Sequence, residues 1–249
     1  MHCFDDNALS FGHAWPKRGY MRVIDFGRPV GASHPPFIIA ALDCRELGTL
    51  ERTLRAIDVA ADSKVDAIRL ARMPSGWCPQ LFARAEKRNL MMLATVLDED
   101  QVARLDWMGA PAFYLVFDWS DLELVARAAE TGKPLVLQVG TASEVELAEV
   151  VATAHAHGKG GIALVQSVID VELEGLAALR RHSAVVGIAD RSRGNEIPRA
   201  AISHGVPIIE KRFALRGDDD LCPKEVGEVV RDCEQLWASI TDDRRWAFN

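Results

Sequence analysis

The chain has 249 residues, a hydrophobic content of 49 % and a formal net charge of −7. This length fits one domain with a large core, and the acidic balance argues against a nucleic-acid-binding surface. No apolar stretch is long enough to span a membrane, so we expect neither nucleic acid nor membrane as a partner. The five cysteines form no CxxC pair, which favours a reducing compartment, the cytoplasm, over a disulfide framework.

The N-terminal segment divides into two parts. Residues 1–20 lack the apolar core of a signal peptide, and we interpret them as a loosely ordered extension of a domain that spans 21–249. Residues 21–31 form two short strand-like runs about Gly27 and predict a hairpin. Two consecutive prolines then prevent a helix and lead into the first long strand.

Eight short apolar runs follow, and an amphipathic segment comes after each of them. The runs are nearly continuous in Val, Ile, Leu and Ala, as in parallel strands that are buried on both faces. Eight strand–helix units predict a closed (β/α)8 TIM barrel, with the hairpin plugging its bottom and the chemistry at the C-terminal ends of the strands. The runs are residues 37–42, 66–70, 90–96, 112–117, 134–139, 161–166, 183–189 and 206–213.

Several helix boundaries are signalled by capping residues. Asp98, Ser120 and Ser143 each stand where a side-chain oxygen could cap the helix that follows. The last helix is expected to begin at Pro223 and to end near Ile240.

The histidines argue against a metal site. Four stand at the expected ends of helices and three precede the barrel, so none directly follows a strand; they are His155, His157, His182, His204, His2, His13 and His34. A catalytic metal needs ligands that converge at one end of the barrel. We therefore expect no metal and no cofactor.

The strand ends carry other polar residues: Asp43, Arg45, Arg69, Arg72, Thr95, Asp98, Asp118, Gln138, Gln166, Asp190, Arg191, Glu210, Lys211 and Arg212. Alternation along the last strand puts Glu210 and Arg212 on one face and Lys211 on the other. Arg69, Arg191 and one of Lys211 or Arg212 could assemble a pocket for phosphate or carboxylate. An equally supported interpretation is that these charges only tie the strand ends together.

Further residues could contribute to binding or catalysis. Thr95, Gln138 and Gln166 are candidate ligand-binding residues, and the loop 190–196 opens a helix whose N-terminal amides suit an anion. The candidates for catalysis are Glu210, Asp190 and Lys211. Cys44 follows the first long strand, but no histidine stands near it to activate a thiol, so we interpret it as a buried small residue. No GxSxG motif supports a hydrolase triad.

Several motifs occur in the same order as in a known family. They include FGRPVG and PPFIIA near the start, ETGKPLVLQVGTAS in the middle, and GIADRSRGNEIPRAAISHGVPIIEKRFAL near the end. From Phe26 to about Ile240, on these motifs, the chain resembles the barrel domain of the N-acetylneuraminate (sialic acid) synthase family. That family belongs to the phosphoenolpyruvate-dependent 3-deoxy-sugar-acid synthases. The resemblance implies a TIM barrel that forms a carbon–carbon bond.

The departures from the family pattern fall on the residues that perform its chemistry. The resemblance implies a glutamate at Ala41, lysines at Arg69 and Tyr114, a Ser-Thr pair at Gln138 and Val139, metal-binding histidines at Gln166 and Arg191, and a histidine at Arg212. The matching positions that remain are Thr95, Asp98, Gly140, Asp190, Gly194, Glu210 and Lys211. The family's C-terminal antifreeze-like domain is not expected in this chain.

Two hypotheses follow, with a weaker third. In the first, the barrel has lost the condensation and binds a small anionic metabolite, or acts as a noncatalytic protein that forms a homodimer or assists a catalytic partner. In the second, it is a divergent, metal-independent synthase or lyase that acts on an anionic sugar or keto acid. The third retains a metal-free condensation with phosphoenolpyruvate.

Overall fold

The computed structural model describes residues 23–117, 122–140, 142–168, 175–183, 185–213 and 222–246, without the side chains of Phe117 and of 243–246. The predicted extension over 1–20, the cap at Ser120 and the strand-end residue Asp118 lie outside these ranges.

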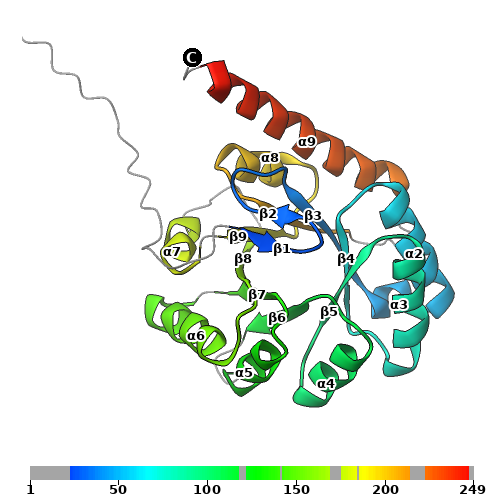
Figure 1. The fold of residues 1–249 in the computed structure, drawn as a ribbon. Helices are drawn as coiled ribbons and strands as arrows, with labels where there is room; N and C mark the ends of the chain where they lie inside the picture. Colours follow the sequence, from blue (N-terminus) through cyan, green and yellow to red (C-terminus); the bar gives the residue numbers. More distant parts are fainter. Residues whose placement is uncertain are drawn as a thin grey trace, which may run out of the picture.

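Eight parallel strands form one closed barrel, in which each strand pairs with the next along the chain and the last pairs with the first (Figure 1). This confirms the (β/α)8 TIM barrel. The observed strand ends differ from the predicted ones by one or two residues in most cases. The strands are β3 (Phe37–Asp43), β4 (Ala67–Ala71), β5 (Met91–Thr95), β6 (Phe113–Phe117), β7 (Leu135–Val139), β8 (Ile162–Val168), β9 (Val185–Asp190) and β10 (Ile208–Arg212).

Helices surround the barrel on its outside (Figure 1). They are α1 (Cys44–Leu47), α2 (Leu50–Asp62), α3 (Cys78–Lys87), α4 (Glu99–Trp107), α5 (Leu122–Glu130), α6 (Glu144–His157), α7 (Gly175–His182), α8 (Glu196–Ser203) and α9 (Pro223–Trp246), with a short 3-10 turn, η1 (Ser75–Trp77), before α3. In the described part of the chain, no helix combines the length and the apolar character that crossing a bilayer requires.

The capping predictions at Asp98 and Ser143 are confirmed. The Asp98 side chain accepts a hydrogen bond from the Gln101 amide at 2.7 Å, and Ser143 forms a reciprocal capping box with Glu146. The predicted end of the last helix is wrong, because α9 continues to Trp246. Residues 241–246 contain no Gly or Pro that would stop a helix, so α9 continues through them.

Alternating side chains give the barrel two apolar layers. One layer lies between the strands and the helices, and the other fills the barrel interior. The interior residues in the lower part of the barrel are Ile39, Ala67, Leu93, Ala112, Val136, Ala163, Val185 and Ile208. Polar groups in the interior are therefore confined to the C-terminal ends of the strands, which we call the mouth.

The N-terminal hairpin closes the opposite end, as predicted. Strands β1 (Ile24–Asp25) and β2 (Pro29–Val30) pair antiparallel across a turn in which Gly27 has a φ of +84°. Ile24, Phe26 and Val30 are buried in the same cluster as the interior residues of the barrel. Figure 1 shows the hairpin lying across the end of the barrel.

Arg28 attaches this hairpin to the barrel. Its Nε donates to Asp66 Oδ1 at 2.6 Å, and its two other nitrogens donate to the carbonyl oxygens of Pro35 at 3.0 Å and Pro36 at 2.7 Å. The second Asp66 oxygen accepts from the amide of Ile38, at the start of β3, at 2.8 Å. Arg28 therefore cross-links the hairpin, β3 and the loop before β4.

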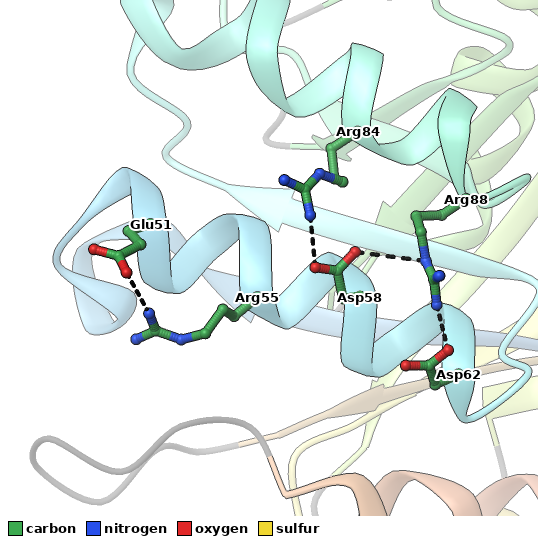
Figure 2. Close-up of polar contacts among 6 residues, drawn as sticks. All are labelled: Glu51, Arg55, Asp58, Asp62, Arg84 and Arg88. Atoms are coloured by element: carbon green, nitrogen blue, oxygen red, sulfur yellow. Dashed lines mark hydrogen bonds and ion pairs between the residues drawn. The ribbon is translucent and has the colours of Figure 1, made fainter.

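A surface network of ion pairs joins α2 to α3 on the outside of the barrel (Figure 2). Asp58 of α2 accepts from Arg84 of α3 at 2.7 Å and lies 3.5 Å from Arg88 Nε, and Arg88 also pairs with Asp62. Exposed pairs of this kind each contribute only about 0.2–1 kcal/mol. We therefore assign this network to helix packing rather than to the functional site.

Replacing Arg28 with methionine should lower the free energy of unfolding by about 1–3 kcal/mol, because charged hydrogen bonds are lost and the half-buried Asp66 carboxylate loses its partner. Urea denaturation measures this change. Arg127→Met, which breaks an exposed pair with Glu130 on α5, should change stability by less than about 0.5 kcal/mol. Equal effects of the two substitutions would contradict the cross-linking role of Arg28.

Candidate functional site

Five side chains form an inner cluster in the barrel interior at the mouth: Arg69 of β4, Thr95 of β5, Tyr114 of β6, Gln138 of β7 and Glu210 of β10. Each stands two residues after an interior apolar residue that lies in its strand or, for Tyr114, directly before it. The period of two in a strand therefore carries all five to the same interior level. Four of them were predicted site residues, and the structure brings these four together.

Arg69 is the centre of the inner cluster. Its Nη2 donates to Glu210 Oε1 at 2.7 Å and its Nη1 donates to Thr95 Oγ1 at 3.2 Å. Its Cζ atom lies 4.5 Å from the centre of the Tyr114 ring, within range of a cation–π contact. Burial alone would lower the pKa of Arg69, but the charge and hydrogen bond of Glu210, together with Tyr114, outweigh it and the pKa is raised. The guanidinium is therefore held in the charged form inside the barrel.

Tyr114 is fully buried and forms the floor of the cluster. Its hydroxyl donates to Gln138 Oε1 at 3.0 Å. Burial raises the pKa of Tyr114 well above its ordinary value, and the negative charge of Glu210 raises it further, while Arg69 and Arg191 oppose the shift. The ring is therefore a neutral phenol at physiological pH, and the charge of Arg191 reaches it.

Arg191 is a cation at the rim of the mouth. It follows β9, its side chain is exposed, and no carboxylate in the described ranges pairs with it. Its backbone amide donates to the Val168 carbonyl oxygen of β8 at 3.3 Å. Arg212, by contrast, pairs with Glu46 of α1. Among the described residues, Arg191 is therefore a positive charge beside the inner cluster that no carboxylate compensates.

The predictions for Lys211, Asp190 and Gln166 need correction, because all three lie on the outer side of the strands. Lys211 Nζ lies 2.5 Å from Asp190 Oδ2, and both side chains are buried against the helical layer. Gln166 faces α7, where a Cβ atom added to Gly175 would come within 2.2 Å of Gln166 Nε2. These residues do not line the interior, since every second residue of a strand points outward. The predicted anion site thus reduces to Arg69, Arg191 and Arg212, with Thr95 and Gln138.

Tyr114 and Glu46 were not among the predicted site residues. Alternation along β6, in which Ala112 and Tyr114 share the interior face, could have identified the tyrosine. Glu46 lies 166 residues from Arg212 along the chain, and no local signal links the two.

The residues present do not fit the metal that the family resemblance implies. Of the two positions that correspond to the metal-binding histidines, Gln166 faces away from the mouth and Arg191 is a cation. Within the described ranges, no group of three or more His, Cys, Asp or Glu side chains could hold a metal ion. We therefore assign no step of any reaction to a metal at this site.

Two other features lie outside the site. Cys44 is buried, and burial raises the pKa of its thiol to about 12, as expected of a structural residue rather than a nucleophile. A hollow of about 690 Å³, lined by Phe26, Arg28, Asp66 and other residues, lies at the hairpin end of the barrel, opposite the mouth.

The burial of Tyr114 predicts that its hydroxyl does not ionise in the folded protein at alkaline pH. The protein has two tyrosines, so Tyr20→Phe leaves Tyr114 as the sole one. Its tyrosinate absorbance should appear only when the protein unfolds. Because the folded pKa lies above the ordinary value of 10.0, the unfolded chain releases this proton first and the free energy of unfolding falls as pH rises past that value.

The matched control is the Tyr20→Phe, Tyr114→Phe double variant, whose alkaline loss of stability should be smaller. Tyrosinate absorbance near the ordinary pKa, with the native circular dichroism intact, would contradict the buried cluster.

Comparison with curated proteins gives distant relatives over most of the chain. The spore coat polysaccharide biosynthesis protein SpsE of Bacillus subtilis is 24 % identical, with 82 % of this chain and 68 % of SpsE covered. A pseudaminic acid synthase of Campylobacter jejuni is 23 % identical, with 72 % and 65 % covered. The chain thus spans about two thirds of the length of these relatives.

Comparison with solved structures supports the same fold. The SpsE crystal structure superposes with a TM-score of 0.79 at 24 % identity, covering 89 % of this chain and 74 % of that one. The N-acetylneuraminic acid synthetase of Leptospira borgpetersenii, in complex with citrate, gives 0.77 at 24 % identity, with 90 % and 92 % covered. The NeuB family model matches residues 49–244. This match confirms the family resemblance, and the chain belongs to the NeuB family.

Proposed function

We propose that the mouth of this barrel binds a small anionic sugar acid or keto acid. The observation that carries the proposal is Arg191, a cation without a carboxylate partner in the described part of the chain, close enough to the inner cluster to act on Tyr114. The names of the relatives give the ligand class further support, since they include a pseudaminic acid synthase and an N-acetylneuraminate-9-phosphate synthase of Drosophila melanogaster.

The charges of the mouth favour a single anionic group. Glu210 compensates Arg69, and Glu46 compensates Arg212, whereas Arg191 has no carboxylate partner in the described ranges and can attract an anion. Planar guanidinium groups match the geometry of carboxylate and phosphate. The second oxygen of Glu210 has no hydrogen-bond donor in the described part of the chain, and it could accept from a ligand hydroxyl. These groups suit a hydroxylated carboxylate or phosphate.

We further infer that the barrel does not perform the metal-dependent condensation with phosphoenolpyruvate. Such a reaction needs a cation to polarise the carbonyl group and basic groups to hold the phosphate. Ala41, which pairs in register with Arg69 and Arg212, offers no carboxylate where the resemblance implies one. Tyr114 stands as a neutral phenol where the resemblance implies a lysine. Both changes remove charged groups from the reaction site.

One observation favours a second candidate, a divergent metal-independent enzyme. Glu210 is a buried carboxylate with one oxygen free of protein donors, and it lies beside the Tyr114 phenol. A carboxylate and a phenol in this arrangement could exchange a proton with a bound sugar or keto acid. Turnover of such a compound that is lost in Glu210→Gln would favour this candidate over simple binding.

Anion binding predicts a rise in melting temperature. Inorganic phosphate or sulfate at ten times its dissociation constant should raise the melting temperature by about 3–6 °C relative to chloride at matched ionic strength, by mass action on the folded state. Arg191→Ala should lose most of this rise. It is preferable to Arg69→Ala, which would leave Glu210 buried without a partner.

Arg193→Ala is the matched control, because it removes the same charge from the same loop and Arg193 is not among the groups that shift the Tyr114 pKa. The Arg193→Ala variant should keep most of the anion-dependent rise in melting temperature. An equal loss in both variants would indicate general charge attraction, and the absence of any rise in the native protein would refute the anion site.

If the barrel does not perform the condensation, an assay of that reaction should detect no activity. With phosphoenolpyruvate, N-acetylmannosamine and added Mn²⁺, phosphate release should not exceed that of a heat-killed sample, because each missing transition-state group costs about 10²-fold or more. Formation of the condensed sugar acid would overturn this inference. A stoichiometric divalent metal that survives dialysis and is lost on mutation at the mouth would do the same.

A further inference from the structure

Lys211 makes three short contacts on the outer side of β10. Its Nζ lies 2.5 Å from Asp190 Oδ2 and 2.8 Å from each of the carbonyl oxygens of Ser192 and Gly194. An ammonium group has three protons, so these acceptors use all of them. The side chain of Lys211 is 5 % exposed and that of Asp190 is 0 % exposed. Lys211 therefore has no donor left for a ligand, although its sequence position had suggested a binding role.

The three acceptors all belong to the loop that carries Arg191. Asp190 ends β9, and its other carboxylate oxygen accepts from the Ser192 amide at 2.7 Å. Gly194 adopts a φ of +75°, which turns the chain toward α8. Asn195 then donates to Asp232 of α9 at 2.9 Å. The loop is thus fixed at both ends and in the middle.

A positive charge is needed at the point where these oxygens converge. A buried carboxylate and two carbonyl oxygens that face one another repel, and each is costly to leave without a donor. The Lys211 ammonium satisfies all three from within the fold, as a bound cation would. Without it, the loop between Asp190 and Gly194 would have to open toward water.

Alternation links this outer contact to the mouth. Asp190 points outward to Lys211, so Arg191, as the next residue, is directed to the other side of the strand end. The Arg191 amide donates to the Val168 carbonyl oxygen at 3.3 Å, so the pairing of β8 with β9, and with it the alternation, continues through this residue. Holding Asp190 therefore also fixes the direction of Arg191.

We infer that Lys211 is a positioning residue, an internal cation that orders the loop 190–194 and holds Arg191 at the mouth without touching the ligand itself. The inference rests on the proposed anion site, but the order of the loop can be measured independently of binding.

The test compares Lys211→Met with the native protein by calorimetric titration with inorganic phosphate. Lys211→Met should bind phosphate about tenfold more weakly, a typical coupling between a remote residue and a site. Because this variant leaves Asp190 buried without a partner and could fail to fold, a Lys211→Met, Asp190→Asn double variant removes both charges and keeps an oxygen for the Ser192 amide. The double variant should show the same loss of affinity.

Arg28→Met is the matched control for stability. Arg28 also contacts three oxygens, but at the hairpin end of the barrel. Its loss should lower the melting temperature and leave the phosphate affinity unchanged. Hydrogen exchange of the amides of 191–194 should accelerate in the Lys211 variants and not in Arg28→Met. In Lys211→Ala, added propylammonium should restore part of the affinity, whereas sodium at the same ionic strength should not.

The outcomes separate the inference from the proposed function. If the native protein binds phosphate and the double variant binds it equally well, the inference is wrong and the anion site stands. If the native protein does not bind phosphate, the anion site is wrong, and the loop-ordering role is decided by hydrogen exchange. Unchanged exchange at 191–194 in the Lys211 variants would overturn the inference in either case.

Discussion

The alternation of side chains along closed parallel strands governs how this protein places its charges. Each residue at a strand end must face either the interior or the helical layer, and both are apolar below the mouth. A charge on either side therefore needs a partner from a neighbouring strand, because an unpaired buried charge is strongly destabilising. On β10 the consecutive residues Glu210 and Lys211 face opposite sides, and each meets an opposite charge.

These two buried ion pairs have different roles at the mouth. The interior pair, Glu210 with Arg69, sets the electrostatics of the inner cluster, in which burial, reinforced by the charge of Glu210, keeps the Tyr114 phenol neutral. The outer pair, Lys211 with Asp190, orders the loop after β9. Arg191 lies between the two systems and is compensated by neither. A rigid surround beside a cation that has no partner in the described ranges is a suitable arrangement for binding an anion, since little reorganisation is needed when the ligand arrives.

In this member of the family, the barrel fold and the residues that would perform a reaction depend on different parts of the sequence. A TIM barrel supports many reactions, because the residues at its strand ends can change while its apolar layers stay the same. Here the layers match those of solved relatives closely enough for TM-scores of 0.79 and 0.77. The polar residues at the mouth, by contrast, include two arginine–carboxylate pairs and the buried phenol of Tyr114. The fold assignment is therefore secure from the barrel, whereas the function depends on a few interior side chains.

The sequence by itself determined the architecture. Nearly continuous apolar runs specify strands buried on both faces, and local signals such as the Asp98 cap, the Ser143 capping box and Gly27 in the hairpin act within a few residues. The alternation of side chains along the last strand also indicated that Glu210 and Lys211 face opposite sides of the barrel wall. Only the tertiary structure decided which strand-end charges are compensated. Arg69 and Glu210 are 141 residues apart, and Arg212 and Glu46 are 166 apart. The tertiary structure also turned Gln166 toward α7, placed Tyr114 against Arg69, and gave Arg191 no carboxylate partner within the described ranges. Pairing between distant strands depends on barrel closure and register, which no local pattern encodes.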